Sequence, residues 1–247
     1  MGRTGRRPLP IDHHFFDRAG KTPDELKALW YFLGISGGSY RVDLPSRRGD
    51  SCNAWCAPNR EVVEIVKRCL KSEHTLSVQK TVYASWRLQI VSEGLAARLS
   101  TEYGLGGTRS EHDVPDELPS AYLAHYVRGL ADAAGKCKVY TRAPGDTGTI
   151  PLRVDLRIRV STSIKEGLWN VLLGKARISK TIAEYNTSSN HLVFTGESIH
   201  RIADYMYRDW AAIEQNGLYA HGKLDDIVHY ARFPHPGKKQ GIAVQTY

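Results

Sequence analysis

The 247 residues of this chain can build a sizeable core, either as one large domain or as two smaller halves. With 41% hydrophobic and 24% charged residues the composition is that of an ordinary globular protein, and no run approaches the roughly 18 apolar residues of a membrane span. The net charge of +8 and the pI near 9.3 favour a polyanionic partner, most often nucleic acid.

The N-terminus and the cysteines argue against two further classes of protein. The first residues are basic but lack the apolar core of a secretory signal, so we expect a cytoplasmic protein. Cys52 and Cys56 are separated by three residues, and neither a second pair nor a nearby histidine completes a zinc site. The four cysteines, which include Cys69 and Cys137, are therefore predicted to be reduced and structural.

The first half of the chain begins with a basic arm and an apolar anchor, residues 1–22. The segment 22–25, Thr-Pro-Asp-Glu, is typical of a helix start. We expect this helix to run to about Ser36, where Gly37 and Gly38 end it. The pattern then predicts two strands, a helix, two strands and a helix that stops at Gly104. These elements span residues 40–44, 52–57, 59–70, 76–82, 86–91 and 92–103.

The polar stretch 105–118, rich in Gly and Pro, is predicted to link two similar halves. The second half opens with a helix at 119–135, which Gly135 should close in the left-handed conformation. It continues with strands 137–142 and 151–160, a helix at 164–173, strands 178–185 and 191–195, and a helix at 197–210. A closing helix at 218–233 has no counterpart. The predicted division of the chain is therefore 1–22, 23–104, 105–118, 119–217 and 218–247.

Two stretches carry the internal repeat. Residues 29–42 match residues 126–139 at a spacing of 97, which aligns Gly38 with Gly135. Residues 88–90 correspond to residues 192–194 at a spacing of 104, so the halves differ by small insertions. In the first match Phe32 stands where the second copy has Gly129, which predicts an asymmetric or less close crossing of the two helices.

The predicted strand 152–160 alternates apolar residues with Arg153, Asp155, Arg157 and Arg159. Like charges so close repel one another, so a phosphate backbone or guanine edges would explain them, whereas the alternative is a solvated face on which Asp155 offsets its neighbours. Further basic candidates on strands and strand tips are Arg41, Arg47, Arg48, Lys80, Arg87, Lys138, Arg142 and Lys180. Candidates for reading base edges are Gln79, Gln89, Asn53 and Asn190.

This order of elements, together with the segment 126–136 and its Arg-Gly pair, resembles the LAGLIDADG homing endonucleases, in particular their single-chain members. The resemblance covers residues ~11 to ~230, nearly the whole chain. It implies an α+β fold of two pseudo-symmetric αββαββα repeats, with central motif helices and two antiparallel β-sheets that form a DNA-binding saddle. It also implies a monomer that binds double-stranded DNA and an origin in an intron or mobile element.

In that family one acidic residue at the foot of each motif helix binds a divalent metal and cuts one DNA strand. The resemblance puts these positions at Gly37 and Ala134, which cannot ligate a cation through a side chain. Asp132 matches the other, usually structural, Asp of the motif. No metal site is then intact. We expect sequence-specific DNA binding without a cofactor, and cleavage that is lost or much reduced, with Mg²⁺ required for any that remains.

Three other functions stay open at this point. An active Mg²⁺-dependent endonuclease would use displaced acids such as Asp132 or Asp43. An RNA-binding intron maturase would use the same fold. A degenerate transcriptional regulator is the third, although the known regulators of this fold add a helix-turn-helix module, for which residues 218–233 are too few.

Overall fold

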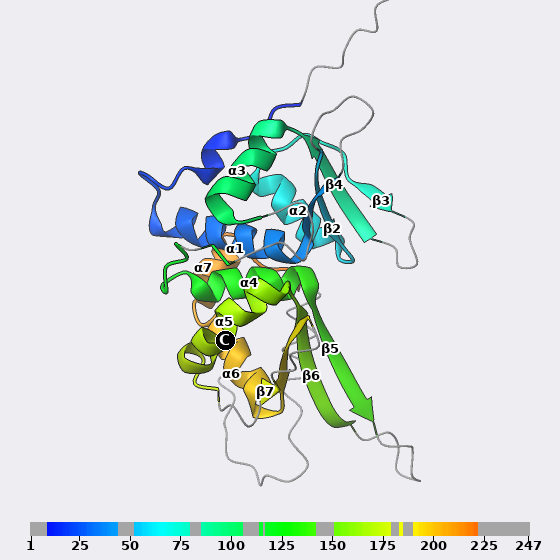
Figure 1. The fold of residues 1–247 in the computed structure, drawn as a ribbon, viewed down its shortest axis with the longest axis vertical. Coiled ribbons are helices and arrows are strands. Elements are labelled where there is room, and N and C mark those ends of the chain that lie inside the picture. The colour runs from blue at the N-terminus through cyan, green and yellow to red at the C-terminus, as the bar shows by residue number, and fades with distance from the viewer. Residues whose placement is uncertain are drawn as a thin grey trace, which may run out of the picture.

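The two halves of the chain repeat one order of elements, as Figure 1 shows. The computed structural model describes residues 9–43, 52–79, 85–105, 114–115, 117–141, 151–178, 183–184 and 190–221. The first half contains α1 (Pro23–Ser39), β1 (Tyr40–Asp43), β2 (Cys52–Ala57), α2 (Arg60–Cys69), β3 (Ser77–Gln79), β4 (Ser85–Val91) and α3 (Glu93–Tyr103). The second half contains α4 (Leu123–Ala134), β5 (Gly135–Thr141), β6 (Pro151–Arg159), α5 (Thr162–Lys175), β7 (Ala183–Glu184), β8 (His191–Thr195) and α6 (Glu197–Tyr207). A short 3₁₀ helix η1 (His13–Phe16) precedes them, and α7 (Trp210–Gln215) follows.

Each half folds one four-stranded antiparallel sheet. The strand orders are β1-β2-β4-β3 and β5-β6-β8-β7, which is the same order twice. Helices cover one side of both sheets, and α1 and α4 lie side by side between the halves (Figure 1). The predicted α+β fold of two αββαββα repeats is confirmed.

The helix starts follow from their first residues. Thr22 and Glu25 form a reciprocal capping box at α1, and the side chains of Asn59 and Ser92 cap α2 and α3. Gly104 closes α3 with a left-handed φ of 63°. These predicted boundaries are confirmed, because each depends on a local hydrogen bond that the residue types reveal. The start predicted at residue 119 is wrong, because that helix begins at Leu123, after a turn.

The central pair of helices, α1 and α4, cross so closely that the backbone of each helix lies against a glycine of the other. A Cβ added to Gly34 would lie 2.0 Å from the carbonyl oxygen of Tyr126, and one on Gly129 would lie 2.2 Å from that of Tyr31. Only glycine fits at either position. The predicted asymmetric crossing is wrong, because Gly34, rather than Phe32, is the partner of Gly129.

The same contact corrects the register of the internal repeat. Gly34 and Gly129 are 95 residues apart, and so are the last helical residues, Ser39 and Ala134, and the first strand residues, Tyr40 and Gly135. Tyr40 N donates to the oxygen of Ser36 and Gly135 N to that of Ala131, again at this spacing. The predicted spacing of 97 is therefore wrong. The spacing of 104 between β4 and β8 is confirmed, since Leu88 and Leu192 hold equivalent rungs of their sheets.

Three glycines that were predicted to end helices have other roles in the structure. Helix α1 continues through Gly37 and Gly38 to Ser39. A Cβ on Gly38 would lie 2.9 Å from the Cβ of Ala133, so this glycine permits close helix packing. Gly135 is extended, with φ −74° and ψ 148°, not left-handed as predicted. Its conformation matches that of Tyr40, at φ −77° and ψ 146°, because both are simply the first residues of strands.

The C-terminal part of the described chain packs across the interface between the halves. Leu218 and Ala220 are buried, and residues 218–220 are not helical, so the start of the helix predicted at 218–233 is wrong. His221 is helical, and the rest of that prediction, from residue 222 on, lies outside the described residues. Among the helices that the structure describes, none is long and apolar enough to cross a membrane.

Candidate nucleic-acid interface

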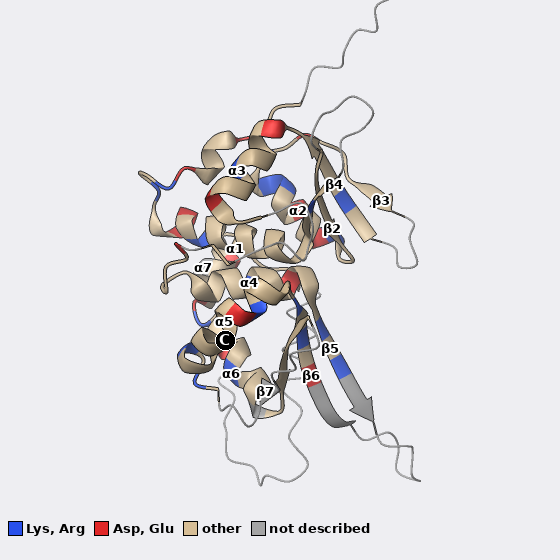
Figure 2. Cartoon of the chain, in the orientation of Figure 1, with Lys and Arg blue, Asp and Glu red and all other residues tan. Residues whose placement is uncertain are grey.

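The basic residues of the second sheet gather on the face opposite its apolar side, which we call its polar face. On β5 the exposed Lys136 stands opposite Arg157 of β6, and the exposed Lys138 stands opposite Asp155. Arg159, also exposed, follows on the same face of β6. Figure 2 shows these cations as blue bands along the two strands. Strand alternation places them together, as predicted for β6.

Asp155 offsets part of this charge. It is fully buried and accepts a hydrogen bond from Arg157 Nη2 at 2.9 Å. The predicted alternative, in which Asp155 balances its neighbours, therefore holds for Arg157. Lys136 and Arg159 make no ion pair within the described part of the chain. Exposed cations without protein counterions are available to an external anion.

In the described part of the chain, the polar face of the first sheet carries fewer charges and more amides than that of the second. Arg41 on β1 and Arg87 on β4 are half-buried, and Arg41 Nη2 donates to Gln79 Oε1 at 3.3 Å. Gln89 is exposed on the same face. Asn53 is buried on the opposite face, where it bonds Tyr40, Ile90 and Ser92, so its predicted role in reading bases is wrong.

Several predicted contact residues lie partly or wholly outside the described part of the chain. Arg153 belongs to β6, in register with Tyr140, but its side chain is outside the described set. Wholly outside the described residues are Arg47, Arg48, Lys80, Arg142 and Lys180.

Two residues of this surface were not predicted from the sequence. Lys136 lies two residues before Lys138, so alternation along β5 would have found it. His191, half-buried at the start of β8, stands opposite Arg159. Only the sheet register reveals it, because neither its neighbours nor its spacing in the sequence mark it as part of the basic face.

The C-terminal ends of α1 and α4, which we call the helix feet, bring Ser39 and Ala134 to equivalent positions. Gly37, the residue that the sequence match placed there, points elsewhere: a Cβ on it would meet Leu130 Cδ2 at 3.1 Å and Tyr126 Oη at 3.2 Å. The Ser39 hydroxyl donates to the oxygen of Ile35 at 2.8 Å. Ala134 is half-buried and offers no ligand atom on its side chain.

Asp132 lies inside the protein rather than at a helix foot. Its carboxylate accepts hydrogen bonds from Tyr31 Oη at 2.5 Å, from Tyr207 Oη at 3.5 Å and from Ala220 N at 3.3 Å. Burial and the nearby Asp132 charge raise the pKa of both tyrosines well above the ordinary value, so both keep the protons that they donate. This arrangement ties α1, α6 and the C-terminal segment to α4.

Replacing Asp132 with alanine should therefore lower the free energy of unfolding by about 2–4 kcal/mol, because three buried donors lose their acceptor. Urea unfolding measures the loss, and Asp204→Ala, at an exposed position on α6, is the control that should change stability by less than about 0.5 kcal/mol. An unchanged stability for Asp132→Ala, with loss of a Mg²⁺-dependent activity, would instead identify Asp132 as a metal ligand.

Arg128 is a second buried charge on α4. Its Nε donates to the oxygen of Leu218 at 3.1 Å, and its Nη1 donates to the oxygen of Met206 at 3.2 Å and to His125 Nδ1 at 3.1 Å. Burial first, and then the Arg128 charge, lowers the pKa of His125 to about 4, so this histidine is neutral at pH 7. These groups hold the C-terminal segment in place.

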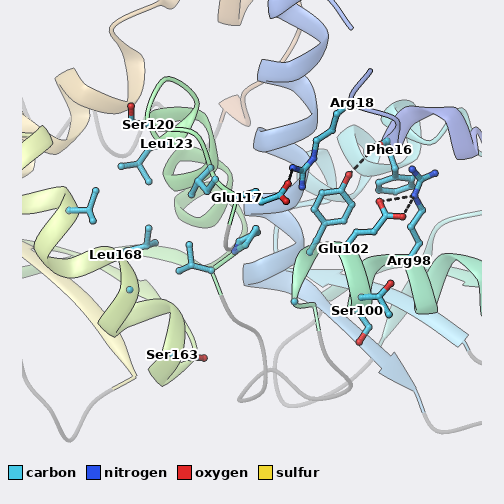
Figure 3. Close-up of a pocket in the computed structure, with 18 of the residues that line it drawn as sticks. Phe16, Arg18, Arg98, Ser100, Glu102, Glu117, Ser120, Leu123, Ser163 and Leu168 are labelled. Carbon is cyan, nitrogen blue, oxygen red and sulfur yellow. Dashed lines mark hydrogen bonds and ion pairs between the residues drawn. The ribbon is translucent and has the colours of Figure 1, made fainter. Parts of the chain in front are cut away.

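A cavity of about 1170 Å³ lies between α3 and α5, away from the strands (Figure 3). The charges that line it are largely satisfied by one another: Arg18 pairs with Glu117, and Arg98 pairs with Asp17 and Glu102. Paired charges offer little to a ligand, so the polar faces of the sheets are the stronger candidate site.

Neither a scan against protein-family models nor a search of curated proteins finds a match to this chain. Solved structures with a similar fold include the LAGLIDADG meganuclease I-CpaMI bound to uncleaved DNA, with a TM-score of 0.48 and 10% identity over 82% of this chain and 90% of that one. Two others are I-SmaMI bound to cleaved DNA (TM-score 0.47, 13% identity, 86% and 89%) and I-GzeII with its DNA target (TM-score 0.48, 9% identity, 82% and 89%). All three are LAGLIDADG proteins.

Proposed function

We propose that this chain binds double-stranded DNA across the polar faces of its two sheets, sequence-specifically and as a monomer, with little or no cleavage. The observation that carries the proposal is the set of cations at adjacent rungs of β5 and β6, in which Lys136 stands opposite Arg157 and next to Arg159. Like charges at such spacing destabilise an isolated sheet, and a phosphate backbone removes the repulsion.

The shape of the second sheet favours duplex DNA over duplex RNA. Strands β5 and β6 pair from Gly135 and Ile158 out to Thr141 and Pro151, whereas β8 covers β6 only at 155–159. Among the described residues the outer part is thus a two-stranded ribbon, which the major groove of B-form DNA admits. The major groove of A-form RNA is too narrow for side chains to read, which argues against a maturase.

The residues at the helix feet do not fit a Mg²⁺ ion, the metal that the resemblance implies. Magnesium prefers carboxylate oxygens, whereas these positions hold a serine whose hydroxyl bonds the backbone and an alanine. Within the described residues no cluster of three or more His, Cys, Asp or Glu side chains forms a metal site. We therefore propose DNA binding that needs no divalent cation.

Binding to a 30-base-pair duplex should weaken steeply with added NaCl, and Lys136→Gln with Lys138→Gln should reduce the slope of log affinity against log salt by about 0.9 for each phosphate that the variant no longer neutralises. Fluorescence anisotropy from 50 to 300 mM NaCl measures both. The exposed Lys175 at the end of α5 supplies the control, since Lys175→Gln should leave the slope unchanged. Equal or tighter binding to a duplex RNA of the same length would reverse the assignment.

A further inference from the structure

The sheet registers place a ring of basic positions around the two helix feet. Arg41 and Lys136 are equivalent, as each is the second residue of the strand that leaves a foot. Cys56 and Arg159 are equivalent, because each follows the residue opposite that strand's first position. Arg87 and His191 complete the set, opposite Cys56 and Arg159. Five of these six positions carry a cation or a histidine, while the feet themselves carry none of the acids that would hold a metal.

We propose that this ring binds backbone phosphates of the central base pairs directly, and that His191 takes up a proton as the phosphate binds. The inference rests on the proposed DNA binding and adds how phosphates are bound around the two helix feet. An anion fits where a metal would be repelled, since Lys136 and Arg159 project from the polar face without an ion pair in the described part of the chain.

The surroundings of His191 explain the proton uptake. Arg157 and Arg159 on β6 and Lys165 on α5 are the charged groups that face it among the described residues. Burial first, and then these three charges, lowers the pKa of His191, so the imidazole of His191 is neutral in the free protein near pH 7. A phosphate beside Arg159 adds negative charge and raises that pKa. Because the complex then binds more protons than the free protein, affinity should rise as the pH falls.

The test is the affinity for a fixed 30-base-pair duplex of mixed sequence between pH 7.5 and pH 5.5, at constant ionic strength. The wild-type chain should bind about three to ten times more tightly at the lower pH, since one unit of pKa shift corresponds to tenfold in affinity. His191→Gln should abolish most of that gain. His74→Gln is the matched control, because His74 also has a lowered pKa but bonds Ser72 on the α2–β3 connection. It should retain the gain.

A second variant keeps the proposal testable if His191→Gln folds poorly. The exposed Arg159→Gln removes a charge that lowers the pKa of His191, so the rise in affinity should become smaller and begin at a higher pH. Binding that is independent of pH, or equally dependent in His191→Gln, would overturn the central phosphate site while leaving DNA binding intact. A failure to bind the duplex at any pH or salt concentration would overturn the proposed function itself.

Discussion

Gly129→Ala should lower the free energy of unfolding by about 3 kcal/mol or more, at the upper end of what a single added methyl group costs in a packed core. The new Cβ would lie 2.2 Å from the carbonyl oxygen of Tyr31 and 2.7 Å from the nitrogen of Ile35. Both obstacles are backbone atoms of α1, so no side-chain rotation can relieve the clash, and the two helices must move apart. Urea unfolding followed by circular dichroism measures the change.

A matched control separates this clash from the general effect of adding a methyl group to a helix. Gly174 lies in α5 with nothing within 4 Å of an added Cβ, so Gly174→Ala should stabilise the protein by up to about 1 kcal/mol through helix propensity. Gly34→Ala should reproduce the large loss, since its Cβ would lie 2.0 Å from the oxygen of Tyr126. A loss below about 1 kcal/mol for both Gly34→Ala and Gly129→Ala would contradict the close crossing.

Local signals were enough to predict most of the elements. Thr22, Asn59 and Ser92 cap helices through bonds to nearby backbone, and β6 shows its two faces by alternation. The glycines were harder to interpret, since the same residue type ends a helix at Gly104 and permits a helix contact at Gly38. The difference depends on a partner helix almost a hundred residues away, which no local pattern contains.

The candidate site was predicted less completely than the fold, for a related reason. Alternation identified Arg157 and Arg159, because both lie on one strand. His191 joins them only through the pairing of β8 with β6, and Ser39 replaces Gly37 only because α1 continues through its glycines. A sequence alignment by motif placed Gly38 on Gly135, whereas the packing of Gly34 on Gly129 shifts the match by two residues.

Ser39→Asp combined with Ala134→Asp should convert the protein into a metal-dependent nuclease, if it binds DNA as proposed. The two positions end α1 and α4, and a Cβ on Gly38, the neighbour of Ser39, would lie 3.2 Å from the Cβ of Ala134, so the two helix ends lie close together. Two carboxylates can hold Mg²⁺ or Mn²⁺, which activates water for phosphodiester hydrolysis. Plasmid cleavage with about 5–10 mM of either ion should exceed that of the wild-type chain by more than about tenfold.

The control for this experiment is a second double variant, in which Gly37 instead of Ser39 is changed together with Ala134. Gly37→Asp with Ala134→Asp should cleave no faster than the wild type and should be less stable, because the carboxylate would enter the contact among Leu130, Tyr126 and Ile164. Mn²⁺ should raise the melting temperature of the Ser39 double variant alone, since the metal relieves repulsion between its carboxylates. Cleavage by the unmodified chain at a comparable rate would show that displaced acids already serve the reaction. Cleavage by the Gly37 variant would instead support the repeat alignment in which Gly38 corresponds to Gly135.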